Sequence, residues 1–444
     1  MNEALGRAAN AAGDAASAEA DVRPVTRTAP RTPAVRAPAE PVQLVWEEPA
    51  GAEGPARACR TRWRSESGQA PPRRVVVADD TMKADAAWRL ACEGTALLWR
   101  GDYHNARQLL QAMARRADGR PRKRAKAPAS AAEAFHLHRM AQAQRARTLG
   151  MLLIPFEAGA RIPLRRAPAV AEVIAEAVAA TPDADLADAP FVMSLRELLG
   201  LIGAHEWRRK GVLVPALGDR IHPWYGVYSP IRGEYLDLIA RAPLPSTALA
   251  FDIGTGTGVI PALLARRGVR RVVATDVSLR ALGCARENLT RLGLLYTAPD
   301  HAAAPSAAGE AGRGELMLAD LFPPRRAPLV VGNPPWVPAK PSSAIEYAVY
   351  DPENRMLRGF LVGLAAHLEE SGEGWLILSD LAEHLGLRTR AELLGWIELA
   401  GLKVIGREEI RPRHPKASDA DDPLHAARAA ERTSLWRLAI SARS

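Results

Sequence analysis

Two short stretches of the sequence carry residue types that can do chemistry together. The first is the glycine-rich turn DIGTGTG at residues 252–258, and the second is Asn333-Pro334-Pro335-Trp336. Each follows a short apolar run of the kind that forms a buried strand. Glycines let a backbone turn sharply and approach a ligand closely, while Asn and Trp offer a hydrogen-bond acceptor and a flat face. We therefore predict one active site, with a cofactor at the first stretch and a nitrogen-bearing acceptor at the second.

The glycine turn has a carboxylate placed to serve a nucleotide. Asp276 ends the next predicted strand, 22 residues after Gly254 (276 − 254). At that position a carboxylate can accept hydrogen bonds from both hydroxyls of a ribose, while the helix that follows the turn points its unpaired N–H groups at the ligand. The alternative is an ordinary strand-to-helix turn in which Asp276 only caps a helix. The alternation of strands and helices around the turn favours the nucleotide site.

The Asn-Pro-Pro-Trp stretch is suited to a planar nitrogen, which is a poor nucleophile because its lone pair is delocalised. The side-chain oxygen of Asn333 and the carbonyl of Pro334 can each accept one N–H, which drives the nitrogen towards a tetrahedral geometry. Trp336 supplies a face for stacking, and Pro334 and Pro335 hold the backbone rigid. The alternative is a structural proline-rich turn after a strand. We therefore predict catalytic roles for Asn333, Pro334, Pro335 and Trp336.

These motifs resemble those of a known family. The spacing GxGxG led by Asp252, in place of the dinucleotide GxGxxG, resembles motif I of the class I S-adenosylmethionine-dependent methyltransferases. The NPPW stretch resembles the NPP(Y/F/W) signature of enzymes that methylate adenine N6 or glutamine N5, with the small-domain methyltransferases and the release-factor glutamine methyltransferase group the most similar. Residues 228–232 (YSPIR) resemble the segment near the methionine end of the cofactor. The resemblance covers about residues 225–444 and implies S-adenosyl-L-methionine as cofactor. The residues that it assigns to the cofactor are Asp252, Gly254, Thr255, Gly256, Gly258, Asp276 and Asp320.

The elements that must position these residues alternate between strand and helix from residue 246 onwards. We predict strands at 247–251, 271–275, 315–318, 329–331, 375–379, 402–405 and 434–440, and helices at 259–267, 278–292, 355–368 and 389–400. Such alternation indicates an α/β fold with a mostly parallel, Rossmann-like, seven-stranded sheet. The last two strands have no clear helix between them, which predicts an antiparallel hairpin at the sheet edge. An Ala/Gly/Pro-rich loop is expected at 296–314.

The region before this domain divides into three parts. Residues 1–75 are rich in Ala, Pro and Arg with little apolar periodicity, which predicts a disordered tail. Residues 76–210 show helical spacing at 86–99, 106–114, 131–153, 168–180 and 194–207, with Asn105 as a cap, and we predict a mainly helical domain that recognises substrate. Residues 211–245 are assigned as a connector with a strand at 211–215, and residues 246–444 as the methyltransferase domain.

Charge and cysteine content bear on partners and location. The 444-residue chain has 59 Lys and Arg against 50 Asp and Glu, a net charge of +9, and a basic run at 115–126. This favours a nucleic-acid partner, although the run also fits a solvated linker. The three cysteines lie far apart, which predicts no metal site and a reducing, cytoplasmic location. No apolar run approaches the ~20 residues of a membrane span.

Three functions remain open on the sequence alone. The leading one is methyl transfer to a planar nitrogen, in a release-factor-like protein or in RNA or DNA. A second is a non-catalytic RNA-binding protein that keeps the methyltransferase fold. A nicotinamide-dependent dehydrogenase is disfavoured by the glycine spacing and by the NPPW stretch.

Overall fold

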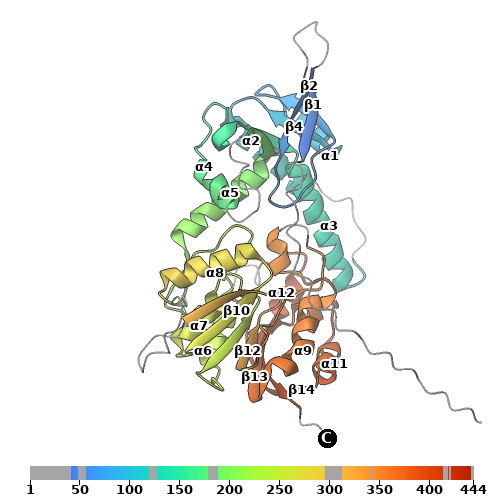
Figure 1. Ribbon diagram of the computed structural model, residues 1–444. Coiled ribbons are helices and arrows are strands. Elements are labelled where there is room, and N and C mark those ends of the chain that lie inside the picture. Colours follow the sequence, from blue (N-terminus) through green and yellow to red (C-terminus); the bar gives the residue numbers. More distant parts are fainter. Residues whose placement is uncertain are drawn as a thin grey trace, which may run out of the picture. The chain divides into compact units, whose positions relative to one another are not determined.

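The computed structural model describes residues 42–48, 57–119, 128–178, 189–295, 313–341, 344–413, 419 and 422–441. These residues form a seven-stranded sheet, a six-stranded sheet and a small two-stranded sheet (Figure 1). The seven-stranded sheet carries the two motifs.

The strands of the larger sheet lie in the order β11-β10-β9-β12-β13-β15-β14. The first five of these run parallel, and β15 is antiparallel to both of its neighbours. The sheet is therefore mostly parallel, with β15 alone reversed and paired to the edge strand β14, which confirms the predicted fold class for this part of the chain. The strands are β9 (Leu249–Ile253), β10 (Arg271–Asp276), β11 (Arg313–Leu318), β12 (Ala327–Gly332), β13 (Leu368–Ser379), β14 (Leu402–Ile410) and β15 (Thr433–Ile440).

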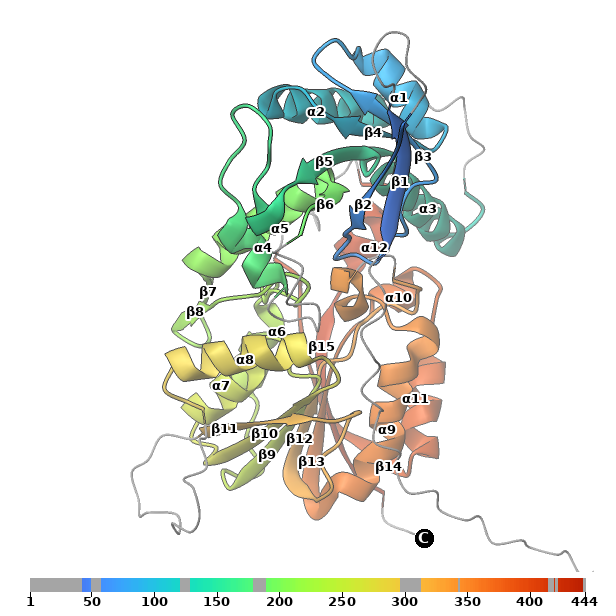
Figure 2. The same cartoon turned by 45° about the horizontal axis from the view of Figure 1, so that its top comes forward.

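Helices cover both faces of this sheet (Figure 2). In β13, Trp375 and Ile377 pack with α6 and α7, whereas Leu376 and Leu378 pack on the opposite face with α9 and α11. Successive strand residues point to opposite faces, so a strand buried on both sides needs a continuous apolar run. The helices are α6 (Glu234–Arg241), α7 (Val259–Arg266), α8 (Leu279–Arg291), α9 (Arg355–His367), the short α10 (Leu381–His384), α11 (Arg390–Leu399) and α12 (His425–Ala430).

The upstream region contains the helices predicted within 76–210, but it is built around a second sheet that was not predicted. Its strands lie in the order β1-β2-β6-β5-β4-β3. They are β1 (Gln43–Glu48), β2 (Arg57–Trp63), β3 (Arg74–Ala78), β4 (Thr95–Trp99), β5 (Leu152–Phe156) and β6 (Phe191–Ser194). The helices between them are α1 (Ala84–Cys92), α2 (Tyr103–Gly119), α3 (Ala131–Leu149), α4 (Ala171–Val178) and α5 (Leu195–Lys210).

The error at β4 and β5 has a physical cause. Every residue of both strands is buried, so neither strand shows the alternation of apolar and polar residues that marks a half-exposed strand. Each directly follows a helix, and its apolar residues extended the helical spacing of that helix. The expected helices at 86–99 and 131–153 in fact end at Cys92 and Leu149.

Two smaller predictions in this region also fail. Strands β1 and β2 lie within the range assigned to the disordered tail, and Leu44 and Trp46 are buried there against β4, β5 and β6. Strands of six and seven residues are too short for their alternation to stand out among Ala, Pro and Arg. Asn105 does not cap α2, because the helix begins at Tyr103, and the side chain of Asp102 accepts the His104 N–H instead (2.9 Å).

Several predictions fall partly outside the described residues. These are the tail before residue 42, most of the loop at 296–314, and the basic run beyond Gly119. Within α2, Arg116 forms an ion pair with Asp85 (2.7 Å). Residues 211–245 contain a hairpin of β7 (Val212–Val214) and β8 (Asp219–Ile221) followed by α6, which confirms the expected strand at 211–215. No helix among the described residues is long and apolar enough to cross a membrane.

Candidate active site

The two motifs and Asp276 meet at the carboxyl ends of three neighbouring strands. In the register of the sheet, Ile253 of β9 is opposite both Gly332 of β12 and Thr275 of β10. The residues that follow these positions are Gly254, Asn333 and Asp276. Strand β9 lies between the other two. Strands β10 and β11 continue the sheet on one side of it and β12 and β13 on the other, so the strand order reverses at β9. Open parallel sheets bind their ligands at such a reversal. The fold thus brings together what the sequence separates by about 80 residues.

The glycine turn needs glycine at each of its three positions. Gly254, Gly256 and Gly258 have φ of +77°, +55° and +79°, in the left-handed region that costs other residues about 1 kcal/mol or more. A Cβ on Gly258 would lie 3.1 Å from Ala285 of α8, whereas a Cβ on Gly256 would meet nothing within 4 Å. Gly258 therefore allows close packing of helices, while Gly256 leaves open space next to the turn.

Asp276 is tied to this turn by hydrogen bonds. One carboxylate oxygen accepts the N–H of Gly256 (3.1 Å) and the other accepts the N–H of Ser278 (2.9 Å). Burial raises the pKa of this carboxyl, although these backbone N–H groups oppose the shift. Each oxygen keeps a lone pair, so the carboxylate can still accept bonds from a ligand.

Apolar side chains flank Asp276 and remain exposed. Val277 and Leu279 follow it and are 67% and 69% exposed, and Leu318, its register partner on β11, is 54% exposed. Aliphatic side chains grouped beside a ribose-binding carboxylate can cover the face of a nucleobase. Asp320, two residues after Leu318, is exposed on the segment beyond β11, and Ala319 donates its N–H to the Asp276 carbonyl (3.2 Å).

Asp252 and Thr255 are buried polar groups next to each other. Both are at most 4% exposed, and the Thr255 hydroxyl lies close enough to lower the pKa of the Asp252 carboxyl, but neither group makes a well-aligned hydrogen bond in the described part of the chain. Burial raises the pKa of Asp252 to about 7. A buried acceptor without a donor costs about 1–3 kcal/mol. The site therefore has unused bonding capacity directly beneath the glycine turn.

The NPPW stretch is arranged differently from the sequence hypothesis in one respect. The indole N–H of Trp336 donates to the side-chain oxygen of Asn333 (2.9 Å). The oxygen that was predicted to accept a substrate N–H therefore already accepts one from Trp336. Trp336 is half-buried and packs against the apolar clusters on both faces of the sheet. The hydrogen bond fixes the orientation of the Asn333 side chain and leaves one lone pair on its oxygen.

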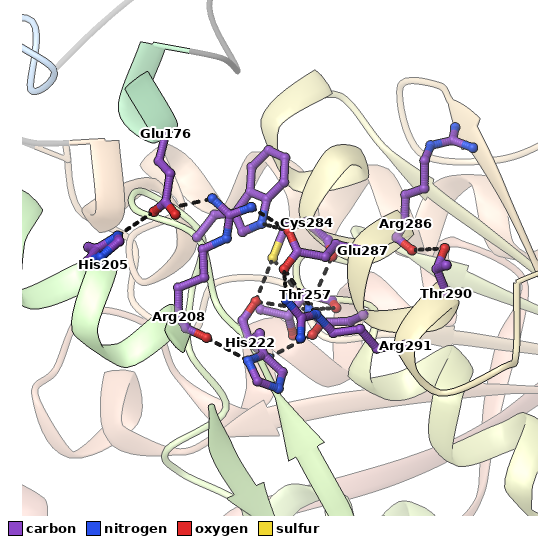
Figure 3. Close-up of polar contacts among 12 residues, drawn as sticks. Glu176, His205, Arg208, His222, Thr257, Cys284, Arg286, Glu287, Thr290 and Arg291 are labelled. Atoms are coloured by element: carbon purple, nitrogen blue, oxygen red, sulfur yellow. Dashed lines mark hydrogen bonds and ion pairs between the residues drawn. The ribbon is translucent and has the colours of Figure 1, made fainter. Parts of the chain in front are cut away.

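A hydrogen-bond network behind the glycine turn holds it in place, and no sequence motif predicted this network (Figure 3). Asn288 of α8 is 1% exposed, and its side-chain NH₂ donates to the carbonyls of Thr257 (3.0 Å) and His222 (3.2 Å). The neighbouring Glu287 accepts from Arg208 of α5 (2.5 Å) and from the Trp224 indole (2.9 Å). An Asn in the middle of an amphipathic helix was the only sequence signal of this role.

A second group that the sequence analysis missed lies at the ends of β13 and β15. Glu431, beside the start of β15, is 1% exposed and accepts from the hydroxyl of Ser379 (2.6 Å) and from Arg232 (3.1 Å). Only the YSPIR resemblance, which includes Arg232, pointed to this region. Within the described ranges, no three His, Cys, Asp or Glu side chains are grouped so that they can hold a metal ion.

Comparison with known proteins gives a likeness of fold and nothing finer. No family model matches the chain, and no curated protein sequence matches it. Similar solved structures include the ribosomal protein L11 methylase from Lactobacillus delbrueckii subsp. bulgaricus, with 15% identity and a TM-score of 0.28 over 46% of this chain and 74% of that one. Wild-type Trm5b from Pyrococcus abyssi has 16% identity and a TM-score of 0.32, and the match covers 50% of this chain and 54% of that one.

The solved structures do not share one activity by name. The cyclase SpnF is also similar, with 15% identity and a TM-score of 0.31 over 46% of this chain and 79% of that one. Identities and TM-scores this low concern the fold alone. The function of this chain must therefore be argued from its own site.

Proposed function

We propose that this protein is an enzyme that uses S-adenosyl-L-methionine to methylate a planar amide or amino nitrogen. The observation that carries the proposal is the meeting of the glycine turn, Asp276 and the NPPW stretch at the carboxyl ends of β9, β10 and β12. Each element alone fits many proteins. Their convergence at the point where the chain turns outward from β9 fits a nucleotide cofactor beside a nitrogen acceptor.

The residues present fit the cofactor. Asp276 would accept the ribose hydroxyls, and Val277, Leu279 and Leu318 would cover the adenine, with Asp320 close to it. Gly256 leaves open space beside the turn. The buried Asp252 and Thr255, which make no well-aligned hydrogen bond in the described part of the chain, fit the polar amino-acid end. When bound, S-adenosylmethionine supplies a methyl group on an electrophilic sulfonium.

The NPPW residues would act on the acceptor. The remaining lone pair of the Asn333 oxygen and the Pro334 carbonyl would each accept an N–H, which localises the nitrogen lone pair for attack. Trp336 would fix the Asn333 side chain through its indole N–H (2.9 Å). Because this hydrogen bond holds the Asn333 oxygen in position before reaction, the side chain needs less reorganisation in the transition state.

Two acceptor classes fit this chemistry, glutamine N5 in a release-factor-like protein and adenine N6 in RNA or DNA. The net charge of +9 supports nucleic acid. Resemblance to the glutamine methyltransferase group supports protein.

The first test is calorimetric titration with S-adenosylhomocysteine, the demethylated form of the cofactor. We expect binding by the full chain, at least tenfold weaker binding by Asp276→Ala, and unchanged binding by Asn333→Ala. No binding by the wild type would reject the enzyme in favour of a non-catalytic RNA-binding protein with this fold.

The second test is transfer of a labelled methyl group to separate protein, RNA and DNA fractions of a cell lysate. Wild-type protein should label one class, and Asn333→Ala should lose most of that labelling while it still binds S-adenosylhomocysteine. Full labelling by Asn333→Ala would show that the NPPW stretch does not present the nitrogen.

A further inference from the structure

A cluster of buried polar side chains borders the proposed acceptor side of the site. We call Arg232, Glu234, Ser379, Glu431 and Thr433 the carboxylate cluster. Its two glutamates are 5% and 1% exposed, and Ser379 and Thr433 are at most 1% exposed. Carboxylates are almost never buried to this extent unless they are paired.

The pairing within the cluster is incomplete. One oxygen of Glu431 accepts from Ser379 (2.6 Å) and from Arg232 (3.1 Å), but its second oxygen has no partner among the described residues. One oxygen of Glu234 and the hydroxyl of Thr433 also lack partners there. Three buried oxygens are therefore left without a donor, and each costs about 1–3 kcal/mol.

The topology places this cluster beside the NPPW stretch. Ser379 ends β13, the strand next to β12, and it is the register partner of Thr433 on β15. Glu234 begins α6, and the adjacent Tyr235 belongs to the apolar cluster against which Trp336 packs. Burial raises the pKa of the Tyr235 phenol, and the nearby carboxylates of Asp252 and Glu234 contribute. The cluster thus lies on the side of Trp336 away from the ribose-binding Asp276.

The balance of charge and hydrogen bonding selects the class of ligand. Glu431 and Glu234 lie near the guanidinium of Arg232, while Arg413, the other cation that acts on Glu234, pairs with Asp237 (3.5 Å). Burial raises the pKa of the Glu234 carboxyl. The buried Arg388 donates to the Asn354 side-chain oxygen (2.9 Å) and to the backbone carbonyl of Ser379 (3.5 Å). Its charge interacts with Glu383 and Asp351, and its Nε has no partner in the described part of the chain. The unsatisfied atoms are two carboxylate oxygens and one hydroxyl. A ligand with several N–H donors and a positive charge satisfies them, whereas a phosphate would be repelled.

We propose that the carboxylate cluster is a subsite for a cationic nitrogen group, an ammonium or a guanidinium, carried by the acceptor. Its place on the acceptor side rests on the proposed function. Glu431 and Glu234 bind the cation, and Thr433 accepts one of its N–H groups. Such a subsite selects a basic peptide or amine as acceptor, and it disfavours a polynucleotide whose phosphates would approach these carboxylates.

The test uses small probes whose binding requires no methyl transfer. The full chain is titrated with Nα-acetyl-argininamide and Nα-acetyl-lysinamide, and with Nα-acetyl-citrullinamide as the uncharged isostere of the first, and dissociation constants are measured by NMR. We expect at least one cationic probe to bind tenfold or more tightly than citrullinamide. Equal binding of all three probes, or no binding of either cation, would overturn the proposal.

Variants locate the binding. Glu431→Gln and Glu234→Gln should each weaken cation binding at least tenfold, and Glu370→Gln, an exposed glutamate near the opposite end of β13, should not. Thr433→Val keeps the shape and removes a hydroxyl that has no partner, so it should fold normally and weaken binding severalfold even if a glutamate variant fails to fold. Unchanged cation binding in all three cluster variants would refute the subsite.

S-adenosylhomocysteine titrations of the same proteins separate the two proposals. We expect cofactor affinity to stay within threefold of wild type in the cluster variants. Loss of cofactor affinity without loss of cation affinity would move the cluster to the amino-acid end of the cofactor and overturn an acceptor subsite. Absence of cofactor binding in the wild type, with cation binding intact, would contradict only the enzymatic proposal.

Discussion

Replacement of Asp252 by asparagine should change how the stability of the protein depends on pH. The folded carboxyl has a pKa of about 7, against 3.8 for the free group, because it is completely buried. Between these values the folded state holds a proton that the unfolded state has released. The contribution of this carboxyl to the free energy of unfolding is therefore largest below about pH 4. It falls as the pH rises to about 7 and stays constant above that.

The size of the effect follows from the shift. Each pH unit of difference corresponds to about 1.4 kcal/mol, so from pH 5 to pH 8.5 the buried carboxylate should destabilise the wild type by roughly 3 kcal/mol. The asparagine side chain introduced by Asp252→Asn cannot ionise. It also lacks a partner at this position, which costs about 1–3 kcal/mol at every pH. The free energy of unfolding of the variant, relative to that of the wild type, should therefore rise by roughly 3 kcal/mol from pH 5 to pH 8.5, whatever the absolute stability of the variant.

The assay is urea unfolding at a series of pH values for the wild type, Asp252→Asn and Asp320→Asn. Asp320 is exposed, so its substitution makes the same change in charge without changing a buried group. We expect the Asp320→Asn curve to run parallel to the wild type within about 0.5 kcal/mol. If Asp252→Asn also runs parallel from pH 5 to pH 8.5, Asp252 is not a strained buried carboxylate, and the case for unused bonding capacity beneath the turn fails.

Three further predictions test the site with four substitutions. Gly258→Ala should destabilise the protein more than Gly256→Ala in urea unfolding, by about 1 kcal/mol or more, because both residues have positive φ but only the first would press its Cβ against α8 (3.1 Å); equal losses would contradict the packing argument. Asn288→Ala removes the donor to the carbonyl in the glycine turn (3.0 Å) and should weaken S-adenosylhomocysteine binding about tenfold in calorimetry, and unchanged affinity would show that the turn holds itself. Trp336→Phe keeps the ring but loses the indole N–H to Asn333 (2.9 Å), so methyl transfer should fall about tenfold at unchanged cofactor affinity, whereas a loss of cofactor affinity would point to a packing role.

Much of the domain at 246–444 could be predicted from the sequence because its signals are local. A glycine turn after an apolar strand and an alternation of strands with helices each depend on neighbouring residues. All seven strands of the larger sheet were expected close to where they lie. In the upstream domain the helices were predicted, but the sheet was not. Its strands β4 and β5 are buried on both sides, so they lack the alternation that separates a strand from a helix.

In the candidate site, too, some features could be predicted from the sequence and others required the tertiary structure. The sequence by itself determined which residues could do chemistry, since the glycines, Asp276 and the NPPW stretch are recognised by type and spacing. Only the tertiary structure decided what each side chain is free to do. It showed the Trp336 indole on the Asn333 oxygen, Asn288 beneath the glycine turn, and Glu431 buried with one oxygen unpaired. These facts depend on contacts between residues far apart in the chain, and burial and hydrogen-bond partners exist only once the sheet has brought them together.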